Sequence, residues 1–117
     1  MNTFNPVQFA VINGVASIFD HIESEGPMWR GTGKRWARAA VRFPTSFVLP
    51  PVVQLSLAMI DADSGRNLRL ELTTEDVSRG GFTAVAHTWS DTRIGRLQLN
   101  WTAFGQGTVA AEPLWDV

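Results

Sequence analysis

The stretch that decides the fold is residues 81–101, GFTAVAHTWSDTRIGRLQLNW. Its two halves predict two β-strands, because apolar residues recur at every second position, the period of a half-buried strand. The predicted inward residues are Phe82, Ala84 and Ala86 in the first strand and Leu97, Leu99, Trp101 and Ala103 in the second. Ile94 is out of phase with the second set, and Gly95 stands where a β-bulge would absorb the slip.

The junction between these two strands carries the strongest functional signal. Residues 89–92, Trp-Ser-Asp-Thr, place a flat apolar ring beside three hydrogen-bonding side chains. A sugar needs both, since its C–H face packs on an aromatic ring and its hydroxyls need fixed polar partners. The junction therefore favours ligand binding over catalysis.

The rest of the chain predicts four more strands. They are residues 15–21, residues 36–43, a strand with Val53, Leu55, Leu57 and Met59 inward, and a strand with Leu68, Leu70 and Leu72 inward. A loop is expected over residues 23–33, and no segment has a convincing helical period. Six short strands separated by turn signals predict an all-β protein, a six-stranded antiparallel β-sandwich.

The domain organisation is expected to be simple. We predict an N-terminal extension over residues 1–13, one domain over residues 14–104 and a C-terminal tail over residues 105–117. Such tails are pinned either to the domain or to a neighbouring subunit.

Composition narrows the class of protein. The chain of 117 residues has no cysteine, so disulfides and thiolate metal sites are excluded. Its net charge is −1. The balanced charge argues against a nucleic-acid or membrane partner. No apolar run approaches the roughly 20 residues of a membrane helix. The N-terminus has no signal-peptide pattern, so we expect any extracellular or particle-surface location to be reached by another route.

Other polar groupings are better explained without chemistry. The acidic turn over residues 61–67 lacks the ligand pattern of a calcium loop, and we expect a solvated turn. His87 is expected to pack or to bond between subunits, because no nucleophile motif accompanies it. We therefore predict no catalytic residues, no metal site and no cofactor. Arg69, on an outward face, offers a rigid fork of donors suited to hydroxyls or a carboxylate.

A dispersed set of residues carries a family resemblance. The set is Phe43, Phe47, Pro50, Pro51, Val52, Val53, Leu57, Asp61, Asn67, Leu68, Arg69, Val77, Gly81, Phe82, Thr88, Trp89, Thr92, Leu99 and Trp101. In order and spacing it resembles the H-type lectin domain of snail N-acetylgalactosamine-binding agglutinins and of the C-terminal part of discoidins. The resemblance covers about residues 14–104. It implies a sandwich that assembles as a trimer, with sugar sites near subunit boundaries and neither metal nor catalysis.

The resemblance also implies site residues. The family's sugar-binding arginine falls on Arg69, and its tryptophan near the subunit contact falls on Trp89. The agglutinins have a histidine where this chain has Ser90, and an aspartate where it has Thr32. Two of the three main polar contacts are therefore altered, and a change of sugar specificity is expected.

Two functions remain open at this point. The first is a homotrimeric or higher lectin module that binds a galactose-like, N-acetylgalactosamine-like or bacterial surface glycan in adhesion. Its expected site residues are Arg69, Trp89, Ser90, Asp91 and Thr32, with Asp91 and Arg35 as substitute polar groups. Trp89 is as well explained by interface packing. The second is a structural part of a larger assembly, such as the spike or fibre of a phage-like particle, with sugar binding weakened or lost.

Overall fold

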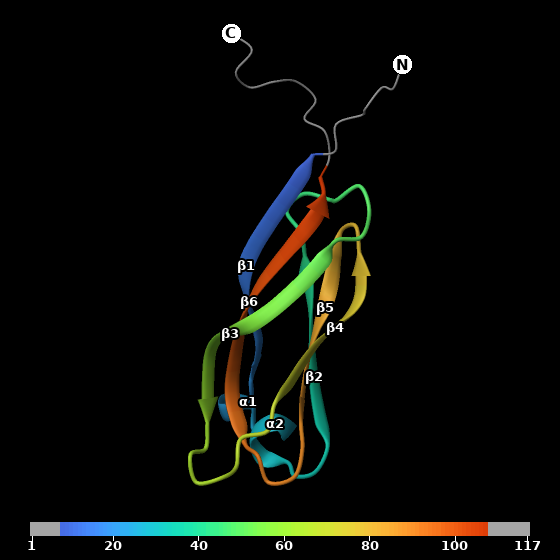
Figure 1. Ribbon diagram of the computed structural model, residues 1–117. Helices are drawn as coiled ribbons and strands as arrows, with labels where there is room; N and C mark the ends of the chain where they lie inside the picture. The colour runs from blue at the N-terminus through green and yellow to red at the C-terminus, as the bar shows by residue number, and fades with distance from the viewer. Residues whose placement is uncertain (1–7, 108–117) are drawn as a thin grey trace, which may run out of the picture.

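The computed structural model describes residues 8–107, which form two three-stranded antiparallel sheets (Figure 1). One sheet has the strand order β1-β6-β3 and the other β2-β5-β4. The strands are β1 (Phe9–Asp20), β2 (Arg35–Arg42), β3 (Val52–Ala62), β4 (Glu71–Ser78), β5 (Gly81–Thr88) and β6 (Ile94–Gln106). The prediction of an all-β chain with six antiparallel strands is confirmed.

The sandwich has two distinct ends (Figure 1). The hairpin end holds the β2–β3 connection, residues 43–51, and the β4–β5 turn, residues 78–81. The helical end holds two short helices, α1 (His21–Ser24) and α2 (Pro27–Arg30), with the β3–β4 and β5–β6 connections. The sequence predicted a strand up to residue 21 and a plain loop over residues 23–33, where these helices lie.

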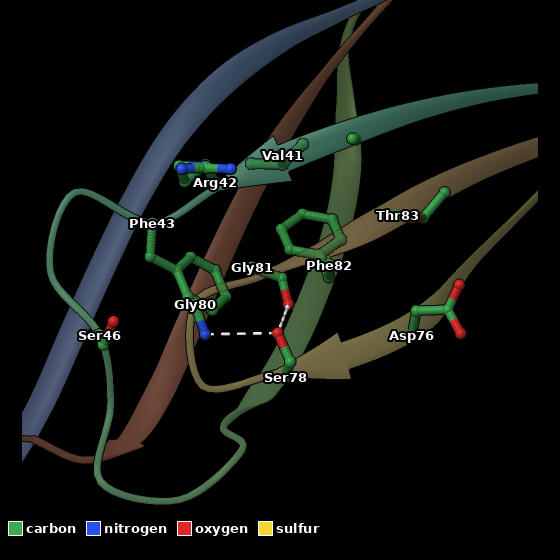
Figure 2. A pocket seen from close by; sticks show the side chains of 11 residues that line it. Val41, Arg42, Phe43, Ser46, Asp76, Ser78, Gly80, Gly81, Phe82 and Thr83 are labelled. Carbon is green, nitrogen blue, oxygen red and sulfur yellow. Dashed lines mark hydrogen bonds between the residues drawn. The ribbon is translucent and has the colours of Figure 1, made fainter.

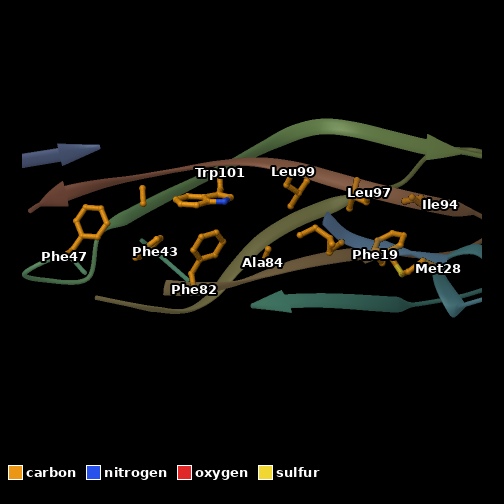
Figure 3. Packing of buried hydrophobic residues seen from close by; sticks show 13 residues of the cluster. Phe19, Met28, Phe43, Phe47, Phe82, Ala84, Ile94, Leu97, Leu99 and Trp101 are labelled. Atoms are coloured by element: carbon orange, nitrogen blue, oxygen red, sulfur yellow. The ribbon is translucent and has the colours of Figure 1, made fainter. Parts of the chain in front are cut away.

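The hydrophobic core lies between the two sheets (Figure 3). The inward residues predicted for β5 and β6 are all buried, at no more than 6% exposed. Rings of Phe43, Phe47, Phe82 and Trp101 gather toward the hairpin end, and Phe19, Met28 and Ile94 fill the helical end (Figure 3). Each large side chain stabilises the fold by about 1.5–3 kcal/mol on burial.

The bulge predicted at Gly95 is present. Asp61 pairs with Arg96 and the next residue, Ala62, pairs with Ile94, so Gly95 is passed over in the register. The shift turns Ile94 inward, where it is completely buried. A Cβ on Gly95 would lie 2.3 Å from Cγ1 of Ile22, so only glycine allows this close packing.

A second bulge, in β3, makes part of the prediction wrong. The register against β6 shifts between Leu57 and Met59, so Met59, predicted inward, pairs with Gln98, and Ile60 instead pairs with the buried Leu97. Leu57 pairs with the buried Leu99 but stays 46% exposed on this edge strand. Beyond the bulge, Ile60 and Ala62 pack on the core. Leu68 is also not inward: it lies before β4 and is 56% exposed.

The first strand begins earlier than expected. β1 starts at Phe9, so residues 9–13 of the predicted N-terminal extension pair with β6. It ends at Asp20, whose side chain accepts a hydrogen bond from the Ile22 amide and begins α1. At the other terminus β6 runs to Gln106, two residues into the predicted tail. Residues 1–7 and 108–117 lie outside the described part of the chain.

Candidate functional site

The β5–β6 connection at the helical end is fastened by its backbone. Ser90 has a positive φ of 61°, which turns its carbonyl toward the start of β2. That carbonyl accepts from the Gly33 amide at 2.9 Å and from Nη2 of Arg35 at 3.1 Å. The connection that carries Thr32 is therefore bound to the one that carries Trp89, Ser90 and Asp91.

Arg35 is the centre of this arrangement. It is only 6% exposed, and burial lowers the pKa of its guanidinium below the ordinary value. The group donates to four carbonyls, those of Gly33 (2.8 Å), Pro27 (3.2 Å), Met28 (3.3 Å) and Ser90 (3.1 Å). Most of its donors therefore hold backbone, and the expectation that Arg35 supplies a polar group to a ligand stays a prediction.

Two buried threonines hold the segment that precedes β4. The Thr88 hydroxyl donates to the Arg69 carbonyl. The Thr92 hydroxyl donates to the Asn67 carbonyl at 2.5 Å and accepts from the Arg69 amide at 3.1 Å. Both threonines are at most 1% exposed, so they fix the backbone on which the Arg69 side chain stands.

Arg69 and Asp91 meet directly. Nη1 of Arg69 lies 2.6 Å from Oδ1 of Asp91, and the two side chains are 29% and 44% exposed. The hydrogen bond from Arg69 lowers the pKa of the Asp91 carboxyl, so the carboxylate stays charged at neutral pH. A fork of donors and an acceptor thus face solvent together.

An exposed ring stands beside this pair in the chain. Trp89 is 37% exposed, and its ring centroid lies 5.2 Å from that of His87. His87 in turn stacks on Trp36 at 4.6 Å and 7°. This stack confirms the expected packing role of His87. The sequence analysis did not predict that Thr88 and Thr92 anchor the backbone. The only sequence signal of this anchoring is that the two threonines flank the loop, next to Trp89 and Asp91.

The structure therefore relates the five predicted site residues as follows. It brings Arg69 and Asp91 into contact, and it joins the loops of Ser90 and Thr32 through the Ser90 carbonyl and the Gly33 amide. Thr32 is exposed and follows α2.

A hollow lies elsewhere, at the hairpin end (Figure 2). It measures about 560 Å³ and is lined by the end of β2 and the β4–β5 turn. Ser78 Oγ donates to the Gly81 carbonyl and accepts from the Gly80 amide, so it serves the turn. Arg42 and Asp76 lie on opposite sides of the hollow (Figure 2). Its charged groups do not converge on one point.

The acidic groups singled out from sequence have protein partners. Asp61 pairs with Arg96 at 2.7 Å, and Asp63 accepts from the Gly65 amide at 2.9 Å. Within residues 8–107, no three His, Cys, Asp or Glu residues are grouped as a metal site would require. In the same span no helix is long and apolar enough to cross a membrane.

The fold and these exposed groups define a class first: a β-sandwich that presents polar and aromatic side chains on the loops of one end. A comparison with known families then specifies it. Residues 38–104 match the H-type lectin domain, and the chain belongs to this family of non-catalytic carbohydrate-binding domains.

Comparison with individual proteins finds relatives in sequence and in structure, among which the discoidins agree with this assignment. The chain is 36% identical over 107 residues to "ATP synthase subunits region ORF 7" of Fuscovulum blasticum, covering 92% of this chain and 91% of that protein. It is 31% identical over 75 residues to Discoidin-2 of Dictyostelium discoideum, covering 62% of this chain but only 29% of that protein. The solved structure of recombinant discoidin II from Dictyostelium discoideum has a TM-score of 0.74 and 26% identity. That match covers 88% of this chain and 41% of discoidin II.

Proposed function

We propose that the protein is a lectin module that binds a surface glycan through Arg69, Asp91 and Trp89. The observation that carries this proposal is the solvent-facing Arg69–Asp91 pair beside a partly exposed indole. A planar guanidinium donates to adjacent hydroxyls, a carboxylate accepts from them, and an indole packs on the C–H face of a sugar ring. The three groups together match one face of a pyranose.

Each proposed contact has free bonding capacity. Within the described residues, Nη1 is the only side-chain nitrogen of Arg69 with a partner, and Asp91 uses only Oδ1. The remaining guanidinium N–H groups and Oδ2 are available to hydroxyls. Ser90 and Thr32, both exposed on joined loops, complete the polar set. The ligand class is a galactose-like or N-acetylgalactosamine-like residue, or a bacterial surface polysaccharide.

The outer face of the β1-β6-β3 sheet supports assembly into a homotrimer or higher oligomer. Val11, Phe104 and Val52 are neighbours in one row across the three strands. Val11 and Val52 are more than half exposed, and the Phe9 ring, 67% exposed, lies 6.4 Å from that of Phe104. An apolar face of this kind fits another subunit. Several weak sites on one oligomer would give useful avidity in adhesion.

The same apolar face favours a second candidate function, a structural part of a larger assembly such as a particle spike or fibre. In that case Arg69 and Asp91 serve only each other, and sugar binding has been lost.

A glycan array separates the two candidates. The full-length oligomer is screened on galactose, N-acetylgalactosamine and bacterial polysaccharide probes, beside Arg69→Ala and the matched control Arg66→Ala. Arg66 is a nearby exposed arginine, 3.8 Å from Asp63. The lectin predicts hits that Arg69→Ala loses and Arg66→Ala keeps. A blank array from folded, oligomeric protein would contradict the lectin and favour the structural role.

A further inference from the structure

A row of side chains crosses the outer face of the β2-β5-β4 sheet next to the helical end. Trp36 of β2 pairs with His87 of β5, and His87 pairs with Glu71 of β4. Residues directly opposite each other in a sheet point to the same side. The three side chains therefore form one continuous strip on the surface.

Stacking fixes the aromatic part of this strip. The His87 ring lies within 4.6 Å of the Trp36 ring and 5.2 Å of the Trp89 ring, centroid to centroid. Nδ1 of His87 is 3.5 Å from the Glu71 carboxylate, and its buried Nε2 has no partner among the described residues. His87 thus acts as a packing element that holds both indoles in place.

Both indoles remain partly open to solvent despite this packing. Trp36 is 47% exposed and Trp89 is 37% exposed, while the Glu71 side chain beside them is 62% exposed. An exposed ring whose orientation is already fixed loses little entropy when a ligand covers it. The strip combines such rings with an exposed carboxylate, so it repeats the indole and the acceptor of the Arg69–Asp91–Trp89 site without the guanidinium.

The strip is also continuous with that site. Trp36 follows Arg35, whose Nη2 bonds the carbonyl between Trp89 and Asp91, at Ser90. Trp89 joins the two directly, because its ring belongs to that site and lies 5.2 Å from the His87 ring of the strip. A pyranose bound at Arg69 would therefore direct its linked neighbour along the strip toward Trp36.

We infer that Trp36, with Glu71, forms a second sugar subsite, so that the ligand of this protein is an oligosaccharide and not a single sugar. This inference rests on the proposed lectin function. The first sugar residue lies at Arg69, Asp91 and Trp89. The next packs its C–H face on the Trp36 indole and donates a hydroxyl to the Glu71 carboxylate.

Titration calorimetry of the full-length oligomer with galactose, galactobiose and galactotriose tests this subsite. The wild type binds galactotriose roughly threefold to tenfold more tightly than galactose, the range expected for one aromatic contact. Trp36→Ala loses that preference and keeps the affinity for galactose. The control Leu49→Ala, at a 58% exposed residue of the hairpin end, keeps the preference.

Because Trp36→Ala could fold poorly, a second measurement uses the wild-type protein, in which the Trp36 ring is intact. In NMR spectra of the wild type, galactotriose shifts the Trp36 indole N–H signal, assigned by its absence in Trp36→Phe, and galactose does not. Three results with Trp36→Ala would each overturn the subsite and leave the lectin function standing. They are an unchanged preference for galactotriose, an equal loss of affinity for galactose and galactotriose, and a change of oligomer mass. Failure of the wild type to bind any of the three sugars or any array glycan would overturn both.

Discussion

The two ends of this sandwich are closed by different physical means. At the hairpin end, Phe43 packs within 5.3 to 5.8 Å of the rings of Phe47, Phe82 and Trp101. At the helical end, Arg35, Thr88 and Thr92 tie loops together by hydrogen bonds to backbone carbonyls. Both sets are buried, but one is apolar and the other is polar.

The difference is the reason why we propose the helical end, and not the hairpin end, as the site of ligand binding. Aromatic rings stabilise the fold only when they are removed from water, so the rings packed at the hairpin end are not available to a ligand. Hydrogen bonds from short buried side chains fix the backbone and leave neighbouring side chains outside. Arg69, Trp89 and Asp91 stand on such backbone, so they are both ordered and accessible.

The largest expected effect comes from removing a ring at the hairpin end. Phe47 is 1% exposed, and Phe47→Ala leaves a cavity in the core. We expect a loss of about 3–5 kcal/mol in the free energy of unfolding, measured by urea titration. Glycan affinity of the folded fraction stays unchanged. If affinity fell as steeply as stability, the two ends would not be independent.

Removing the polar anchor at the helical end should cost less stability but abolish binding. Arg35→Met keeps the length of the side chain and withdraws donors from four carbonyls. We expect the free energy of unfolding to fall by roughly 1–3 kcal/mol. We expect glycan binding to be lost in the same variant. Arg38→Met is the matched control, since Arg38 is an exposed strand neighbour paired only with Glu75. An Arg35→Met protein with normal affinity would show that the loops need no anchor.

A smaller effect is expected from pH. Nδ1 of His21 accepts from the Met28 amide at 3.2 Å, and burial lowers the pKa of His21 below 6.5, with Asp20 opposing. As the pH falls below 6.5, the unfolded chain binds the proton first, so the free energy of unfolding decreases until the lowered pKa is reached. Urea midpoints across this range measure the decrease. A His21→Asn variant with the same pH dependence would assign it to another group.

The smallest change of stability is expected for Asp91→Asn. The pair with Arg69 is solvent-facing, so its removal leaves the urea midpoint unchanged within error. Glycan affinity changes, because the charged acceptor is lost and the Arg69 fork is released. Calorimetry with the best array glycan measures this. A variant with unaltered affinity would remove Asp91 from the site.

Local sequence patterns were sufficient for the strands but not for contacts between them. Alternation identified β5, β6 and the bulge at Gly95, because each depends on neighbours in the chain. The change of face at Met59 depends on a bulge in β3 that no glycine marks.

The candidate site shows the same division. Arg69, Trp89 and Asp91 were found from residue type and family resemblance. The anchoring role of Arg35 depends on a contact 55 residues away in the chain, and the Trp36–His87 stack depends on strand register. Neither has a signal in the residues themselves, so both required the structure.

The most direct test of the account is a crystal structure of the full-length protein with the strongest glycan from the array. The account predicts a sugar ring against the Trp89 indole, with its hydroxyls bonded to Arg69 and Asp91 at the helical end. A glycan seated instead in the hollow at the hairpin end, between Arg42 and Asp76, would contradict it.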